Sequence, residues 1–194
     1  ADELQADTLD EQAHDALASG DVEGALEQLQ HAVATDPSNQ DARFDYVKLL
    51  LQLGHVEEAR LAFTPVQPQA ASVRRLGALQ DWLNALDFVA ASALGADAGA
   101  TFDAQIAANK RDFDARFGRA RWLMAQQRWT DAMDELLEIL MRDKAWNNEA
   151  ARTTYISILE LIAPPPVKVA EGHIPPEDPV LASYRRRLSS VVLS

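Results

Sequence analysis

A pattern that repeats every 34 residues constrains the first part of this chain more than any other feature. A glycine and three apolar positions recur at this spacing, as Gly20/Gly54, Val22/Val56, Ala25/Ala59 and Leu29/Phe63. A glycine adopts the left-handed backbone of a sharp turn after a helix without steric cost. A small alanine lets the next helix pack closely against the previous one, because a larger side chain would overpack the contact. The repeat therefore predicts stacked helical hairpins.

A second repeat places the same tetrapeptide, Asp-Ala-Arg-Phe, at Asp41–Phe44 and Asp114–Phe117, an offset of 73 residues. The apolar residues that follow keep the same register, as Val47/Ala120, Leu50/Leu123, Leu51/Met124 and Ala59/Ala132. We predict that each copy begins the first helix of a hairpin, with Ser38 starting the earlier one and residues 112–142 forming the later hairpin. Where the earlier copies have glycine the later one has Gln127, so this turn either differs in geometry or holds Gln127 in the left-handed conformation.

The remaining segments predict further helices and one long interruption. We expect helices at about 69–93, near 101–110 and at Trp146–Ile162, with a break at residues 94–100. Six prolines in residues 163–179 predict an extended linker. Asp178 followed by Pro179 is a typical helix start. The expected organisation is a helical array at 1–162, a linker at 163–178, and a C-terminal helix at 179–194 that belongs to the same unit.

A period of 34 with these glycines and alanines resembles the tetratricopeptide repeat, a helical hairpin that stacks into solenoids. The C-terminal third narrows the resemblance. The stretches "NNEAARTTYISILELIA" and "DPVLASYRRRLSSVVL" are similar to the end of the YbbN-type thioredoxin-like co-chaperones, also called CnoX or chaperedoxins. The most specific matches are Ala151-Arg152, Asp178-Pro179 and Tyr184–Leu188, and the resemblance covers about residues 8–193. The expected fold is all-α, an array of tetratricopeptide-like hairpins.

The resemblance implies a protein-binding module that holds unfolded or partly folded proteins and passes them to a chaperonin or another folding machine. The sequence contains no thioredoxin-like domain and no cysteine, so the chain looks like the C-terminal half of such a protein, and these residues carry no redox role. The alternative is a tetratricopeptide adaptor or scaffold in a bacterial secretion or envelope assembly. We expect a cytoplasmic protein that is not an enzyme.

Composition and charge exclude several other classes of protein. The net charge of −12 argues against nucleic-acid binding, which depends on neutralising phosphates. No apolar run approaches the roughly 18 residues of a membrane span. The absence of cysteine excludes thiol catalysis and cysteine-based metal sites. The four histidines, His14, His31, His55 and His173, show no metal-ligand spacing. We therefore predict no catalytic residue, no cofactor and no metal ligand.

Two sets of residues are candidates for contacting protein partners. In tetratricopeptide arrays the first helix of each hairpin lines the binding face, which places there Phe44, Lys48, Leu51, Phe117, Arg121 and Met124. Apolar side chains beside a cation suit an extended peptide with apolar and acidic side chains. The alternative is that the two phenylalanines pack between helices. Asp7, Asp10, Asp41 and Asp114 argue against a clamp for a C-terminal carboxylate.

The second set lies on the C-terminal helix and consists of Tyr184, Arg185, Arg186, Arg187, Leu188 and Val192. By resemblance this helix is a candidate chaperonin contact. The arginines meet an acidic partner surface or simply form a solvated helix face. The apolar stripe of the helix contacts a second copy of the chain, another protein or the chain's own array.

Overall fold

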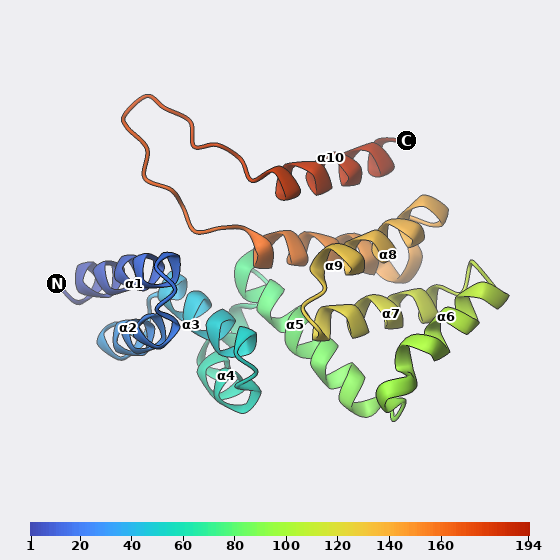
Figure 1. The fold of residues 1–194 in the computed structure, drawn as a ribbon, viewed down its shortest axis with the longest axis horizontal. Coiled ribbons are helices and arrows are strands. Elements are labelled where there is room, and N and C mark those ends of the chain that lie inside the picture. The colour runs from blue at the N-terminus through green and yellow to red at the C-terminus, as the bar shows by residue number, and fades with distance from the viewer. The chain divides into compact units, whose positions relative to one another are not determined.

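The structure, a computed structural model that describes residues 1–194, is built of α-helices and short 3-10 segments (Figure 1). The chain divides into two compact units, Ala1–Leu79 and Gln80–Ser194. This boundary lies inside the range 1–162 that the sequence predicts as one array. The predicted all-α architecture of helical hairpins is confirmed.

The first unit contains two hairpins. α1 (Asp2–Ala18) pairs with α2 (Val22–Thr35), and α3 (Gln40–Gln52) pairs with α4 (Val56–Phe63). Gly20 and Gly54 form the turns with φ of 83° and 79°, as their places in the repeat predict. Ala25 and Ala59 are fully buried. A 3-10 segment, η1 (Thr64–Gln69), and the first turns of α5 (Arg74–Ala91) complete the unit.

Both copies of the repeated tetrapeptide lie in the first turns of a helix, as predicted. The N-cap of α3 is Asn39, whose side chain accepts a hydrogen bond from the Ala42 amide at 3.0 Å. The prediction that Ser38 starts this helix is therefore wrong by one residue, because the Ser38 amide and hydroxyl donate to Asp36 Oδ1 instead. In the later copy Asp112 caps α7 in the same way.

The second unit contains the rest of α5, the 3-10 segment η2 (Gly95–Asp97) and α6 (Ala98–Ala108), followed by the hairpin of α7 (Phe113–Ala125) and α8 (Trp129–Arg142). This hairpin occupies the predicted range, and Gln127 takes the left-handed conformation with φ of 58°. α5 begins at Arg74 rather than near residue 69, because residues 64–69, with Pro65 and Pro68, form a 3-10 segment and residues 70–72 form a turn. α6 ends at Ala108 rather than near residue 110.

The last two helices pack together. α9 (Trp146–Ile162) has the predicted bounds, but residues 147–149 form a left-handed turn and regular helical dihedrals begin at Ala150. Residues 163–178 contain no helix, and α10 (Pro179–Leu193) lies along α8 and α9 (Figure 1). Leu181 and Tyr184 join the core of the unit, and the Tyr155 hydroxyl donates to the Tyr184 carbonyl at 2.6 Å. The apolar stripe of α10 therefore folds back on its own array.

Candidate partner-binding site

The predicted groove residues of α3 lie mostly in the core. Phe44 and Leu51 are 2% and 3% exposed, so their side chains pack between helices, which is the alternative that the sequence leaves open for Phe44. Lys48 is half-buried, with its Nζ 5.8 Å from the centre of the Phe44 ring. The Arg75 guanidinium lies closer to the same ring, at 4.1 Å. The first unit therefore presents cations above Phe44 rather than the ring itself.

The corresponding residues of α7 are more accessible. Met124 is fully buried, but Phe117 and Arg121 are half-buried. The Arg121 guanidinium lies between two aromatic rings, 4.3 Å from the centre of Phe117 and 4.7 Å from that of Phe88. Such contacts hold a guanidinium in place by the attraction between a cation and the negative face of a ring. Phe117 and Arg121 therefore form one preorganised surface.

This surface opens into a cavity of about 330 Å³ among α5, α7 and α9. The cavity brings together all three predicted residues of α7. It is lined by Asp81, Asn84, Phe117, Arg121, Met124, Asn147, Asn148, Ala150, Thr153 and Thr154. The lining combines one guanidinium and one carboxylate with amides, hydroxyls and apolar side chains. This composition suits a peptide, whose backbone needs hydrogen-bond partners as well as apolar contacts.

Arg121, the cation that lines this cavity, does not use all of its hydrogen-bond donors. Nε of Arg121 is buried and donates no hydrogen bond. Burial lowers the pKa of Arg121, and the Asp81 carboxylate opposes that shift. Burial raises the pKa of Asp81, although Asp81 Oδ2 accepts a hydrogen bond from the Ser157 hydroxyl at 2.5 Å. A guanidinium that is both desolvated and short of acceptors favours an incoming carboxylate or carbonyl oxygen.

The polar residues that α5 and α9 contribute to the cavity were not expected from the sequence. Asn147 and Asn148 line the cavity from the left-handed turn at the start of α9, with φ of 51° and 53°. The pair of asparagines is a signal that could have found this turn, since asparagine is one of the few residues that tolerate the left-handed region. Asp81 and Asn84 carry no such signal, because their place depends on how α5 packs.

The predicted residues of α10 divide into buried and exposed ones. Tyr184 is buried and its hydroxyl donates to Asp134 Oδ1 at 2.9 Å, while Leu188 and Val192 are half-buried. The three arginines are exposed. Arg185 pairs with Glu177 at 2.5 Å, and Arg187 pairs with Asp134 at 3.3 Å.

A second, more open cavity of about 570 Å³ lies between α8 and α10. It is lined by Asp134, Leu137, Glu138, Met141, Ser183, Arg186, Arg187, Ser190 and Val191. Met141 is 57% exposed there. The structure thus places two of the predicted arginines beside an accessible apolar side chain, although the rest of the stripe packs inward.

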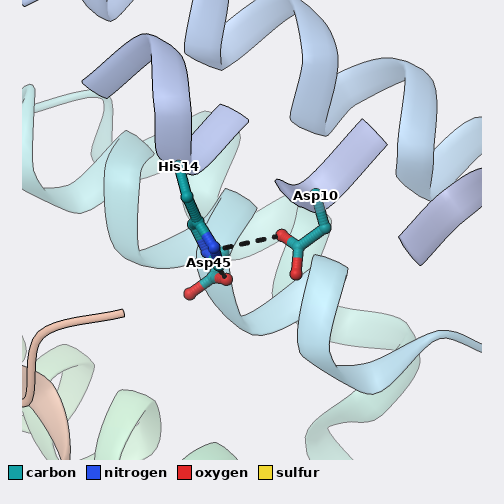
Figure 2. A group of neighbouring side chains, drawn as sticks. All are labelled: Asp10, His14 and Asp45. Carbon is teal, nitrogen blue, oxygen red and sulfur yellow. Dashed lines mark hydrogen bonds and ion pairs between the residues drawn. The ribbon is translucent and has the colours of Figure 1, made fainter. Parts of the chain in front are cut away.

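The first unit holds a group of titratable side chains that no pattern in the sequence predicts as a group. His14 Nε2 donates a hydrogen bond to Asp45 Oδ2 at 2.7 Å and lies 3.9 Å from Asp10 Oδ1 (Figure 2). The hydrogen bond to Asp45 raises the pKa of His14, whereas burial and the neighbouring Asp45 raise that of Asp10 to about 7. Burial alone would raise the pKa of Asp45, but His14 brings it below the ordinary value.

The spacing of Asp10 and His14, one helical turn apart, was the available signal for this group. Residues four apart lie on the same face of a helix. Asp45 comes from α3, 31 residues away, and no periodicity in the sequence points to it.

Comparison with known proteins agrees with the helical architecture. Family models described as tetratricopeptide repeat match residues 93–192 and residues 16–83. No curated protein matches the chain. No helix combines the length and the apolar character that crossing a bilayer requires. Tetratricopeptide arrays bind protein partners on the surface formed by their stacked repeats. The repeat pattern, the helical hairpins and the match over more than half of its residues show that this chain belongs to the tetratricopeptide-repeat family.

Proposed function

We propose that the cavity among α5, α7 and α9 binds an extended segment of a partner protein. The observation that carries the proposal is Arg121, held between Phe88 and Phe117 with a buried Nε that lacks an acceptor. An acidic side chain of the segment would accept hydrogen bonds from Arg121, and a neighbouring apolar side chain would cover the Phe117 ring. The amides of Asn147 and Asn148 suit the backbone of such a segment.

Fluorescence polarisation with labelled peptides tests this proposal. We expect peptides with an acidic residue next to Leu or Phe to bind, and Arg121→Gln to weaken binding about tenfold because a charged hydrogen bond is lost. Arg128→Gln is the matched control, since Arg128 is exposed at the N-cap of α8 and pairs with Asp131 at the surface. Equal affinities of the Arg121→Gln and Arg128→Gln variants would show that the cavity is not the binding site.

For the whole chain we propose the protein-binding module of a thioredoxin-like co-chaperone, a cytoplasmic and non-enzymatic protein that holds unfolded clients and passes them to a chaperonin. The motifs at Ala151-Arg152, Asp178-Pro179 and Tyr184–Leu188 support this assignment. An aggregation assay with a thermally unfolded client tests it. Protection at near-stoichiometric ratios supports a co-chaperone. Absence of protection, together with tight binding to one folded partner, would instead favour an adaptor of a bacterial secretion or envelope assembly.

The proposed chaperonin contact requires a separate experiment, because α10 is part of the core. Deleting residues 179–194 would uncover the apolar residues that Leu181 and Tyr184 contact, so loss of binding could reflect unfolding. Replacing the exposed Arg185 and Arg186 with glutamine avoids this problem. We expect the double variant to lose affinity for purified chaperonin while helical content stays unchanged. Unchanged affinity would exclude these two arginines from the contact.

A further inference from the structure

We propose that Asp10, His14 and Asp45 form a zinc-binding site between α1 and α3. One candidate ligand atom from each side chain lies within 4.8 Å of the other two. No metal ligand was expected from the sequence, and the proposed peptide-binding cavity is lined by other residues. The inference therefore stands apart from the proposed function.

The geometry is close to that of a three-ligand zinc site. His14 Nε2 lies 2.7 Å from Asp45 Oδ2 and 3.9 Å from Asp10 Oδ1. A tetrahedral zinc ion bonded at about 2.0–2.2 Å holds its ligand atoms roughly 3.3 Å apart, which lies between these two distances. Small side-chain rotations therefore suffice to accommodate the ion. The fourth position would be taken by water, since all three side chains are partly accessible.

A second observation is that one oxygen of Asp10 has no hydrogen-bond partner. Asp10 Oδ1 is buried and accepts no hydrogen bond, although it faces His14 in Figure 2. A buried carboxylate oxygen without a donor is costly, and natural structures rarely leave one unexplained. The carboxylates of Asp10 and Asp45 also repel each other when both are ionised, and without metal a hydrogen bond between the two carboxyl groups limits this repulsion. A divalent cation would take the place of the shared proton and would bind the unpaired oxygen as well.

The ligand set selects zinc over the common hard cations. Calcium and magnesium prefer sites made of oxygen atoms alone, whereas one imidazole nitrogen with two carboxylates suits zinc. The surrounding charges are Asp41, Lys48 and Arg75, and Arg75 Nη2 lies 3.8 Å from Asp45 Oδ1. Arg75 pairs with the carboxylate oxygen of Asp45 that His14 does not contact, which helps to orient this carboxylate. The two cations also oppose a metal ion, so we expect micromolar affinity.

Isothermal titration of the chelator-treated full chain with zinc chloride at pH 7.5 tests the proposal. We expect one equivalent to bind, and the affinity to fall at least tenfold in His14→Gln, Asp10→Asn and Asp45→Asn. His31→Gln is the matched control, because His31 is exposed on α2. Zinc should raise the midpoint of thermal unfolding in the wild type and in His31→Gln, since it links α1 to α3. The three ligand variants should show no such rise.

Asp10→Asn keeps the test decisive, because it removes one of two repelling carboxylates and is expected to fold, which circular dichroism verifies. A wild-type chain without saturable zinc binding in the micromolar range would overturn the proposal. Undiminished binding in Asp10→Asn and His14→Gln would overturn it as well, since the zinc would then occupy other surface carboxylates. In both cases the three side chains form only a hydrogen-bonded group.

Discussion

The two hairpins that begin with the repeated tetrapeptide, α3–α4 and α7–α8, use the same arginine in different ways. Arg43 and Arg116 hold the same place in the repeat, and both are buried. Each donates a hydrogen bond to the carbonyl just before its own helix, Arg43 to Pro37 at 3.1 Å and Arg116 to Lys110 at 2.8 Å. This shared contact fixes the chain entering the helix, which explains why both copies need an arginine there.

The second contact of the two arginines differs. Arg43 donates to the Ala62 carbonyl at 3.1 Å, whereas the matching position in the later copy is Glu135, whose Oε1 accepts from Arg116 at 2.6 Å. Glu135 Oε2 also accepts from Arg119. A neutral backbone contact in one hairpin is thus a buried ion-pair network in the other. One hairpin pattern therefore accommodates either solution for a buried guanidinium.

The faces of the two first helices differ for a related reason. Asp45 corresponds to Gly118, where an added Cβ would lie 2.7 Å from Phe102. The aspartate of the earlier copy meets His14 and Asp10, whereas the glycine of the later copy lets aromatic rings approach. The first unit also has 14 acidic and 5 basic residues, net −9, against 16 and 13 in the second, net −3. The repeat thus determines where the helices form, and single residues such as Asp45 and Gly118 determine which side chains meet on their faces.

Replacing the phenylalanines of the two tetrapeptides should give the largest difference in stability between the two units. Phe44→Ala should lower the free energy of unfolding of the first unit by about 3–5 kcal/mol, because the side chain is fully packed. Phe117→Ala should cost the second unit less than half as much, since the Phe117 side chain is only partly buried. Urea unfolding separates the two units, because all four tryptophans lie at residue 82 or later. Tryptophan fluorescence then follows the second unit and circular dichroism follows both. Equal losses would show that the two rings are buried alike.

The ion-pair network should make the α7–α8 hairpin sensitive to the loss of one carboxylate. The α3–α4 hairpin has no corresponding carboxylate. Glu135→Ala leaves Arg116 buried without its carboxylate, and we expect a loss of about 3–5 kcal/mol. Glu138→Ala on the same helix is the control, because Glu138 pairs with Arg142 near the surface and its loss should cost at most about 1 kcal/mol. Tryptophan fluorescence during urea unfolding measures both. Similar losses would mean that the buried network adds nothing beyond a surface pair.

The stability of the metal-free first unit should depend on pH through Asp10 and His14. Folding raises the pKa of both groups, Asp10 from 3.8 to about 7 and His14 above 6.5. The folded state therefore binds more protons than the unfolded state, and stability falls as pH rises from about 4 to beyond 7. Asp45 acts in the opposite sense only below pH 4, because its pKa is lowered.

Thermal unfolding followed by circular dichroism between about pH 5 and pH 8, with a chelator present, measures this dependence. Asp10→Asn should flatten it, since the variant cannot bind the extra proton. A wild-type chain whose stability rises over this range would contradict the assignment of the pKa shifts to this group.

The turns of the two hairpins give the smallest expected effects. Gly54→Ala forces a residue with a Cβ into the left-handed conformation at φ of 79°. This should lower the free energy of unfolding of the first unit by about 1–2 kcal/mol. Gln127→Gly should stabilise the second unit by up to about 1 kcal/mol, because it relieves the same strain at φ of 58°. Opposite signs in the two denaturation curves would confirm that both turns share one backbone conformation. A destabilised Gln127→Gly variant would show that the glutamine side chain holds its turn together.

Much of the fold could be predicted from the sequence because its signals are local. The glycines at 20 and 54 mark turns, the alanines at 25 and 59 mark close contacts, and Asp178-Pro179 marks a helix start. Each signal depends on a few neighbouring residues and on a helix period that the chain itself repeats. The hairpins, their order and the bounds of the last helix followed from these signals alone.

Only the tertiary structure decided which residues of those helices reach solvent and which groups meet. Phe44 and Met124 were expected on a binding face but are buried, whereas Arg121 lies between rings from two helices. His14 meets a carboxylate 31 residues away, and α10 docks on α8 and α9 across a linker without helices. These contacts join segments far apart in the chain, and a periodic pattern gives the face of a helix without giving the neighbour that covers it. The repeat therefore determined the scaffold, and packing between distant segments determined its binding chemistry.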